Sequence, residues 1–85
     1  MEADKEMNRI IFSAYVDILK YNIKKLRTDS GLSIERFAEL CELSVSTYKS
    51  LENTHIEKEP TLKTVFFIAS NLEISMDKLM RTILV

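Results

Sequence analysis

The sequence predicts a compact all-α domain of five helices with an extended N-terminal helix. Apolar residues recur at helical spacing along most of the 85 residues. No segment alternates apolar and polar residues over enough positions to require a sheet. The chain has one glycine, Gly31, and one proline, Pro60, and each falls at an expected helix boundary. Nearly continuous helix is therefore expected.

Composition is typical of a soluble protein, with 46% hydrophobic and 29% charged residues. A chain of this length can form one small core without metal or disulfides. The single cysteine, Cys41, has no internal partner, which favours a reducing cytoplasm and a buried, unreactive thiol. No run approaches the roughly 20 apolar residues of a membrane span, and the N-terminus lacks a secretion signal. We expect a cytoplasmic protein without membrane contact.

The first predicted helix runs from about residue 4 to residue 28. The apolar stretch 10–16 resembles a strand, but the apolar residues from Met7 to Leu26 keep helical spacing across it. We divide the chain into an N-terminal helical extension, 1–21, and one globular unit, 22–85. The end of the helix is basic, with Lys20, Lys24, Lys25 and Arg27. These cations either complement the helix dipole or contact phosphate, and the sequence leaves both readings open.

Two short helices are predicted at about 34–41 and 45–53, each with a serine start signal. Ser33 and Ser44 can accept a hydrogen bond from an unpaired N–H in the first turn of the helix that follows. Tyr48 and Leu51 are expected to point inward. Helices of this length, joined by about 3–4 residues, form a helix-turn-helix unit, and its second helix usually reads the major groove. Further helices are expected after Pro60 and after Ser75.

Several short motifs, in order and at fixed spacing, carry a resemblance that covers about residues 22–80. They are Ile23-Lys24-Lys25-Leu26-Arg27, Gly31-Leu32-Ser33, Phe37-Ala38, Leu43-Ser44, Tyr48, Leu51-Glu52-Asn53, Pro60 with Leu62, Ala69, Leu72, Ile74-Ser75 and Leu79. This set resembles the DNA-binding domain of the lambda-repressor and Cro-like (XRE) family. The resemblance implies a lambda-repressor-like fold and a structural ion pair between Arg27 and Glu52.

The resemblance and the helical geometry together give a set of candidate DNA-binding residues. They are Ser33, Ser44, Val45, Ser46, Thr47, Lys49, Ser50, Asn53 and Lys58. Helical spacing predicts that Val45, Ser46, Lys49, Ser50 and Asn53 point outward. Serine and valine discriminate bases weakly compared with long bidentate side chains, so we expect modest selectivity through this face.

Three features depart from the family pattern. Ile34 stands where the family usually carries a glutamine that binds phosphate. Glu42 and Glu73 stand in turns where glycine is common, because the chain there prefers positive φ. Net charge is −1, and residues 23–55 hold five basic and five acidic side chains. A balanced charge predicts weak non-specific DNA binding and a shallow salt dependence.

The favoured function is a sequence-specific DNA-binding regulator, a repressor that binds a palindromic operator as a homodimer with helix 45–53 in the major groove. The alternative is a protein-interaction module, such as an antirepressor or regulator-masking partner, that keeps the fold but not the DNA face. An enzyme is not expected, since the chain has no nucleophile–base pair and no phosphate-binding glycine loop. His55 is the only histidine, and we expect no catalytic residue, cofactor or metal.

Apolar residues at both ends exceed what one small core needs. They are Met7, Ile10, Ile11, Phe12, Ala14 and Tyr15 near the start and Ile83, Leu84 and Val85 at the end. Either these ends pack on each other within one chain or they form a dimer interface. The sequence favours the dimer interface.

Overall fold

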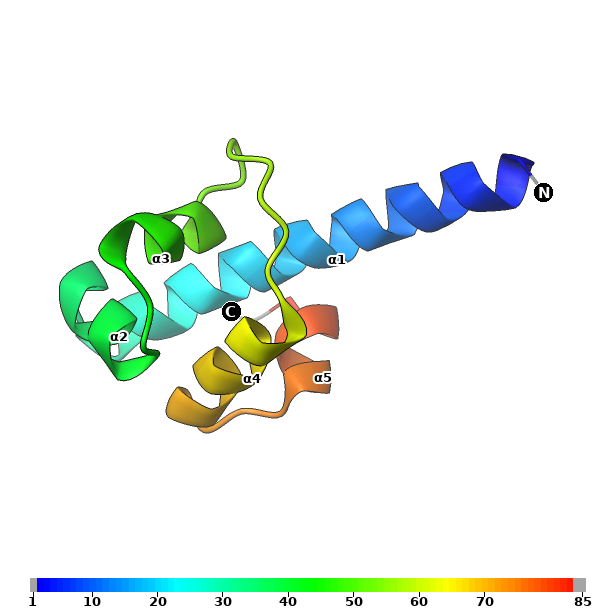
Figure 1. Cartoon of the computed structure of the whole chain (residues 1–85). Helices are drawn as coiled ribbons and strands as arrows, with labels where there is room; N and C mark the ends of the chain where they lie inside the picture. Colours follow the sequence, from blue (N-terminus) through cyan, green and yellow to red (C-terminus); the bar gives the residue numbers. More distant parts are fainter. Residues whose placement is uncertain (1, 84–85) are drawn as a thin grey trace.

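The computed structural model describes residues 2–83, and these residues form five helices and no strand. The helices are α1 (Glu2–Asp29), α2 (Ile34–Leu40), α3 (Val45–Glu52), α4 (Leu62–Asn71) and α5 (Met76–Arg81), as Figure 1 shows. The predicted all-α class, the order of the helices and the extended first helix are confirmed. Within the described range no helix is both long and apolar enough to cross a membrane.

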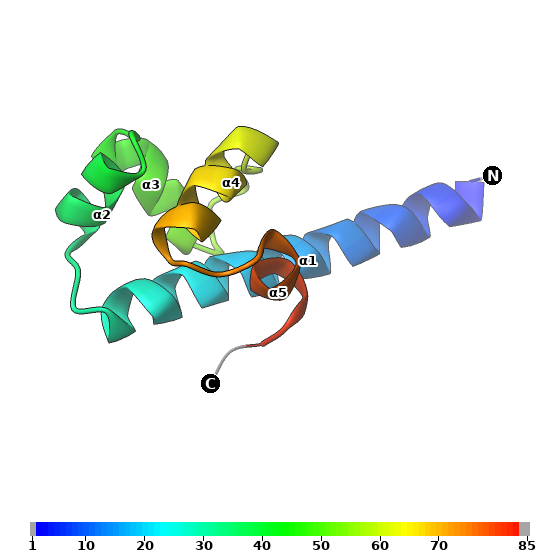
Figure 2. The same ribbon diagram turned by 90° about the horizontal axis from the view of Figure 1, so that it is seen from below.

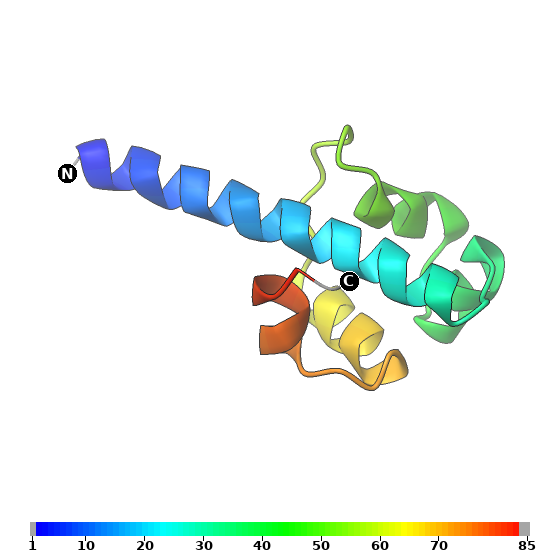
Figure 3. The ribbon, with the colours of Figure 1, turned by 180° about the vertical axis from the view of Figure 1, so that it is seen from behind.

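Helix α1 runs the length of the molecule, and the other helices gather around its C-terminal half. Figure 2 shows α2, α3 and α4 on one side of α1, with α5 packed beside it. The N-terminal half of α1 extends past all of them, which Figure 3 shows from the opposite side. The principal extents of 44 × 25 × 21 Å reflect this projection. The apolar stretch 10–16 lies within α1, so helical spacing identified its structure correctly.

All five helices contribute to one hydrophobic core. Its fully buried members are Leu19, Ile23, Phe37, Ala38, Cys41, Tyr48, Leu51, Val65, Ile68, Ala69 and Leu79. The edge of the Phe37 ring meets the Tyr48 ring with centroids 5.3 Å apart and planes at 73°, a favourable T-shaped contact. This contact joins α2 to α3 at the centre of the helix pair.

The two turns that carry glutamate have the same geometry. Glu42 has φ 58° and Glu73 has φ 54°, so both residues adopt the left-handed conformation that glycine favours. Leu43 N–H donates to the Ala38 carbonyl at 2.9 Å, which closes the end of α2 in the manner of a Schellman turn. Ile74 N–H donates to the Ala69 carbonyl at 3.0 Å in the same way after α4. The glutamates therefore end two helices at a cost of about 1 kcal/mol each in backbone conformation.

Candidate nucleic-acid interface

The helix pair begins at two serine caps. The Ser33 hydroxyl accepts a hydrogen bond from Arg36 N–H at 3.0 Å, and the Ser44 hydroxyl accepts one from Thr47 N–H at 3.1 Å. The Ser44 and Thr47 hydroxyls also bind each other at 2.9 Å. Both predicted caps are therefore present. Because the Ser44 hydroxyl already holds Thr47, its first role is to fix the start of α3.

The end of α3 is held against α1 by the carboxylate of Glu52. Arg27 donates through Nε to Glu52 Oε1 at 2.5 Å and through Nη2 to Oε2 at 3.2 Å, a bidentate pair. The Tyr48 hydroxyl donates to the same Oε1 at 2.6 Å. Arg27 also donates through Nη1 to the Leu32 carbonyl at 2.8 Å. With the Arg27 and Glu52 side chains only 10% and 7% exposed, this cluster is structural and lies away from solvent.

The electrostatics of the cluster agree with its geometry. The hydrogen bond to Glu52 raises the pKa of the Arg27 guanidinium above its ordinary value. Burial, followed by the hydrogen bond to Glu52, raises the pKa of the Tyr48 hydroxyl well above its ordinary value. Arg27 therefore stays charged and Tyr48 stays neutral in the folded protein. Both residues then keep the N–H and O–H groups that donate to the Glu52 carboxylate.

The predicted outward face of α3 is narrower than helical spacing suggested. Ser46 and Lys49 are exposed, whereas Val45 is half-buried and packs against the core. Ser50, predicted to point outward, is buried with 6% exposure, and its hydroxyl donates to the Thr47 carbonyl at 2.6 Å. A serine is small enough to fold back in this way, so the inward side of α3 includes a third position. Ser50 has no access to a base edge in this arrangement.

The remaining candidates lie at the rim of this face. The exposed ones are Ser33, Ser44, Asn53 and Lys58, and Thr47 is half-buried. The Asn53 Oδ1 accepts a hydrogen bond from His55 N–H at 2.9 Å, so this amide is turned toward the following loop. Lys49 is therefore the long polar side chain of α3 that faces solvent.

A shallow hollow beside α3 brings basic residues from three segments together. Lys24 of α1, Lys49 of α3 and His55 of the loop line it, with Ile34 at the start of α2. Glu52, Asn53 and Thr54 complete its lining. We call it the Lys24–Lys49 hollow. The two lysines bring positive charge of the kind that contacts phosphate to one side of α3. Lys24 and His55 were not among the predicted site residues.

Most cations at the basic end of α1 have structural partners, whereas Lys24 lies at the Lys24–Lys49 hollow. Lys25 binds Asp29 at 3.0 Å, Arg27 binds Glu52, and Lys20 is buried with 2% exposure. The Lys20 ammonium donates to the carbonyls of Asn53 at 3.0 Å and Ile56 at 2.6 Å. Neither reading of the basic cluster had anticipated this role, since Lys20 holds the loop that follows α3.

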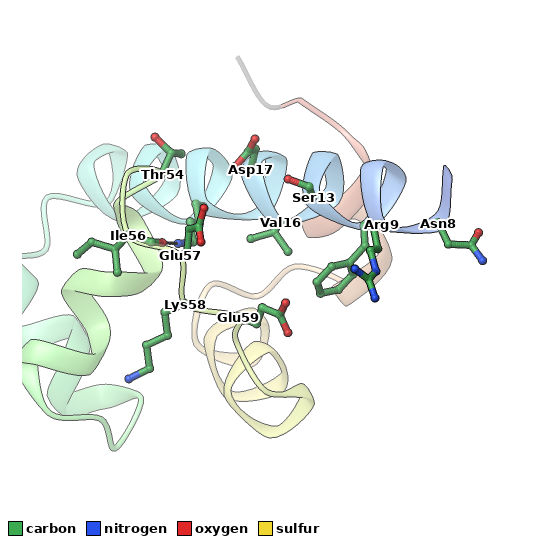
Figure 4. A pocket seen from close by; sticks show the side chains of 12 residues that line it. Asn8, Arg9, Ser13, Val16, Asp17, Thr54, Ile56, Glu57, Lys58 and Glu59 are labelled. Atoms are coloured by element: carbon green, nitrogen blue, oxygen red, sulfur yellow. Dashed lines mark hydrogen bonds between the residues drawn. The ribbon is translucent and has the colours of Figure 1, made fainter. Parts of the chain in front are cut away.

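A second, larger depression lies between the N-terminal half of α1 and residues 54–59, and we call it the α1–loop groove. Figure 4 shows side chains of α1, among them Arg9, Ser13 and Asp17, together with Glu57 and Glu59 of the loop. Phe12, Val16 and Lys20 also line it, together with Asn8, Thr54, Ile56 and Lys58. Three cations and three carboxylates balance here, so the groove carries no excess of positive charge to attract a polyanion.

Comparison with known proteins gives a family match that covers more than half of the chain. A family model described as helix-turn-helix, HTH_3, matches residues 23–79. No curated protein and no solved structure matches the chain. The matched range contains α2 and α3, their serine caps, and the Arg27–Glu52 pair. The chain therefore belongs to the XRE-type helix-turn-helix family of DNA-binding domains, whose members are typically transcriptional regulators without enzymatic activity.

Proposed function

We propose that this chain is a sequence-specific repressor that acts in the cytoplasm as a homodimer on a palindromic operator. Helix α3 enters the major groove of double-stranded DNA, and the bound dimer blocks a promoter sterically. The observation that carries the proposal is that α2 and α3 form a rigidly held helix pair and that Lys49 of α3 is exposed at the Lys24–Lys49 hollow. The Glu52 cluster fixes α3, and the hollow supplies positive charge for a phosphate.

Ser46 lies in the first turn of α3, the part of a recognition helix that reaches base edges. Its hydroxyl can bond several bases and discriminates little among them. Lys49, one turn later, reaches either guanine or a flanking phosphate. Base readout through this face is therefore modest, and the shape of the operator carries part of the selectivity.

Salt dependence follows from the exposed cations. Lys24, Lys49 and Lys58 are each exposed, and together they give about three phosphate contacts in one protomer. The logarithm of the binding constant then falls with the logarithm of salt concentration with a slope of about −3 for each protomer. Strongly basic regulators have a steeper slope.

The test is binding of fluorescent genomic DNA fragments over a salt titration. Lys49→Ala is expected to weaken binding and to reduce the slope by about 1. Ser46→Ala is expected to weaken binding without changing the slope. Lys78→Ala removes an exposed cation from α5, away from the interface, and serves as the matched control.

A protein-interaction module that keeps the fold is the second candidate, and the exposed Glu42 beside α3 favours it together with Ile34 in the hollow. An acidic turn and an apolar residue suit a protein surface better than a phosphate. Absence of DNA binding at low salt by the folded protein would reject the repressor and favour this candidate.

A further inference from the structure

The projecting half of α1 carries an exposed apolar stripe. Met7 is 56% exposed, Ile10 64% and Ile11 45%. Ala14 is also exposed, and half-buried Ile18 continues the same face toward the body of the protein. Residues three and four apart lie on one side of a helix, so these side chains form a continuous surface. Solvent-exposed apolar stripes of this kind mark interaction sites.

The described part of the C-terminal end, which stops at Ile83, does not cover this stripe. Ile83 is 64% exposed, and the apolar residues of α1 remain open to solvent. The alternative that the two ends pack on each other within one chain is therefore wrong for the described residues. Leu84 and Val85 lie outside the described residues.

We propose that the stripe is the docking surface for a second copy of this chain, with the two α1 helices paired antiparallel. The pairing is centred between Phe12 and Ser13. Met7 then faces Ile18 of the partner subunit, and Ile11 faces Ala14 of the partner subunit. The positions 7, 11, 14 and 18 are symmetric about this centre, so the stripe is self-complementary, as an interface with two-fold symmetry must be.

The helix dipoles favour the antiparallel direction. Two antiparallel helices place the positive end of each dipole beside the negative end of the other, whereas a parallel pair places like ends side by side.

The position of α3 on α1 gives the component of the separation between the two α3 helices that lies along the α1 axis. Lys20 and Arg27 hold residues 52 and 53 at the end of α3, so this end lies at the level of residues 20–27 of α1. Two such levels in the antiparallel pair are separated by about 33 Å along the axis, at about 1.5 Å per residue. This axial component alone is close to the roughly 34–36 Å between consecutive half-sites on DNA. This step rests on the proposed function, whereas the pairing itself does not.

The same geometry places the two DNA faces on one side of the dimer. The two-fold axis of an antiparallel pair is perpendicular to the plane that contains both helices. Lys24 lies roughly 110° around α1 from the centre of the stripe, at about 100° per residue. It therefore points nearly along the axis, and the Lys24–Lys49 hollows of both copies face the same way.

Sedimentation velocity tests the surface. The wild-type chain is expected to be a dimer, and Ile11→Glu a folded monomer with an unchanged far-UV circular dichroism spectrum. Arg9→Glu places a glutamate about 170° around α1 from the centre of the stripe, at an exposed position, and is expected to remain a dimer. A monomeric wild type, or an Ile11→Glu variant that still dimerises, would overturn the proposal.

Cysteine cross-linking tests the direction. A mixture of Met7→Cys and Ile18→Cys chains is expected to form disulfide-linked heterodimers, whereas each variant alone does not. The native Cys41 is buried and does not interfere. Cross-linking of Met7→Cys alone would overturn the antiparallel register.

Binding of genomic DNA fragments is measured separately, so that the two proposals can fail independently. An antiparallel dimer that does not bind DNA refutes only the repressor, and a monomer that binds DNA refutes only the pairing.

Discussion

Replacement of Glu52 by glutamine isolates the role of the buried ion pair. Glutamine keeps the size of the side chain but loses the charge and one of the two acceptor oxygens. Arg27, whose side chain is 10% exposed, then loses its carboxylate partner and keeps the Leu32 carbonyl. Breaking a buried pair by removing one charge costs about 3–5 kcal/mol. Because the Leu32 bond and the amide oxygen remain, we expect a loss of about 3 kcal/mol in the free energy of unfolding.

Urea unfolding followed by far-UV circular dichroism measures this loss as a lower unfolding midpoint with an unchanged slope. The matched control is Glu39→Gln, which breaks the pair of Arg36 with Glu39 at 3.0 Å. That pair is 55% and 73% exposed, so its loss is expected to change the free energy of unfolding by less than about 0.5 kcal/mol. Equal effects of the two substitutions would refute the assignment of Glu52 as a buried structural anchor.

Three other substitutions test separate parts of the fold. Burial raises the pKa of Cys41 from 9.0 to about 11, so the unfolded chain releases this proton first. The free energy of unfolding of the wild type is then expected to fall between pH 9 and about pH 11, by about 2–3 kcal/mol more than that of Cys41→Ala in parallel urea titrations. Glu42→Gly relieves the residue at φ 58° and is expected to raise the free energy of unfolding by about 0.5–1 kcal/mol, seen as a higher urea midpoint. Lys20→Met keeps the aliphatic stem but removes the donor to Asn53 and Ile56, so hydrogen exchange in residues 53–59 is expected to accelerate; unchanged protection there would contradict the role of Lys20.

Sequence reasoning succeeded where the determinant is local. Ser33 and Ser44 each cap a helix whose first-turn N–H lies three residues later, and this spacing is visible in the sequence. The left-handed turns at Glu42 and Glu73 were expected from the family pattern, and both have the same local order of an apolar residue, a glutamate, an apolar residue and a serine cap. Such features depend on neighbours within a few positions, so one sequence contains enough information to place them.

Sequence reasoning failed where a side chain binds a residue far away in the sequence, and where a helix is too short to show a clear pattern. Lys20 binds backbone carbonyls 33 and 36 positions away, and a backbone carbonyl has no residue-type signature. Ser50 was placed outside because α3 has only eight residues, and two apolar positions do not fix the width of its buried side. The Lys24–Lys49 hollow likewise forms from three segments that become neighbours only when α1 and α3 pack together.

Helix α1 carries both the exposed apolar stripe and the side chains that hold α3. It runs from Glu2 to Asp29 without glycine or proline, so the stripe and the level of α3 are connected by a continuous, stiff helix. Slippage of the antiparallel pair by one heptad would change the separation of the two α3 levels by about 10 Å. In the proposed dimer the position of the stripe along α1, and not only its apolar character, therefore sets the distance between the two α3 helices.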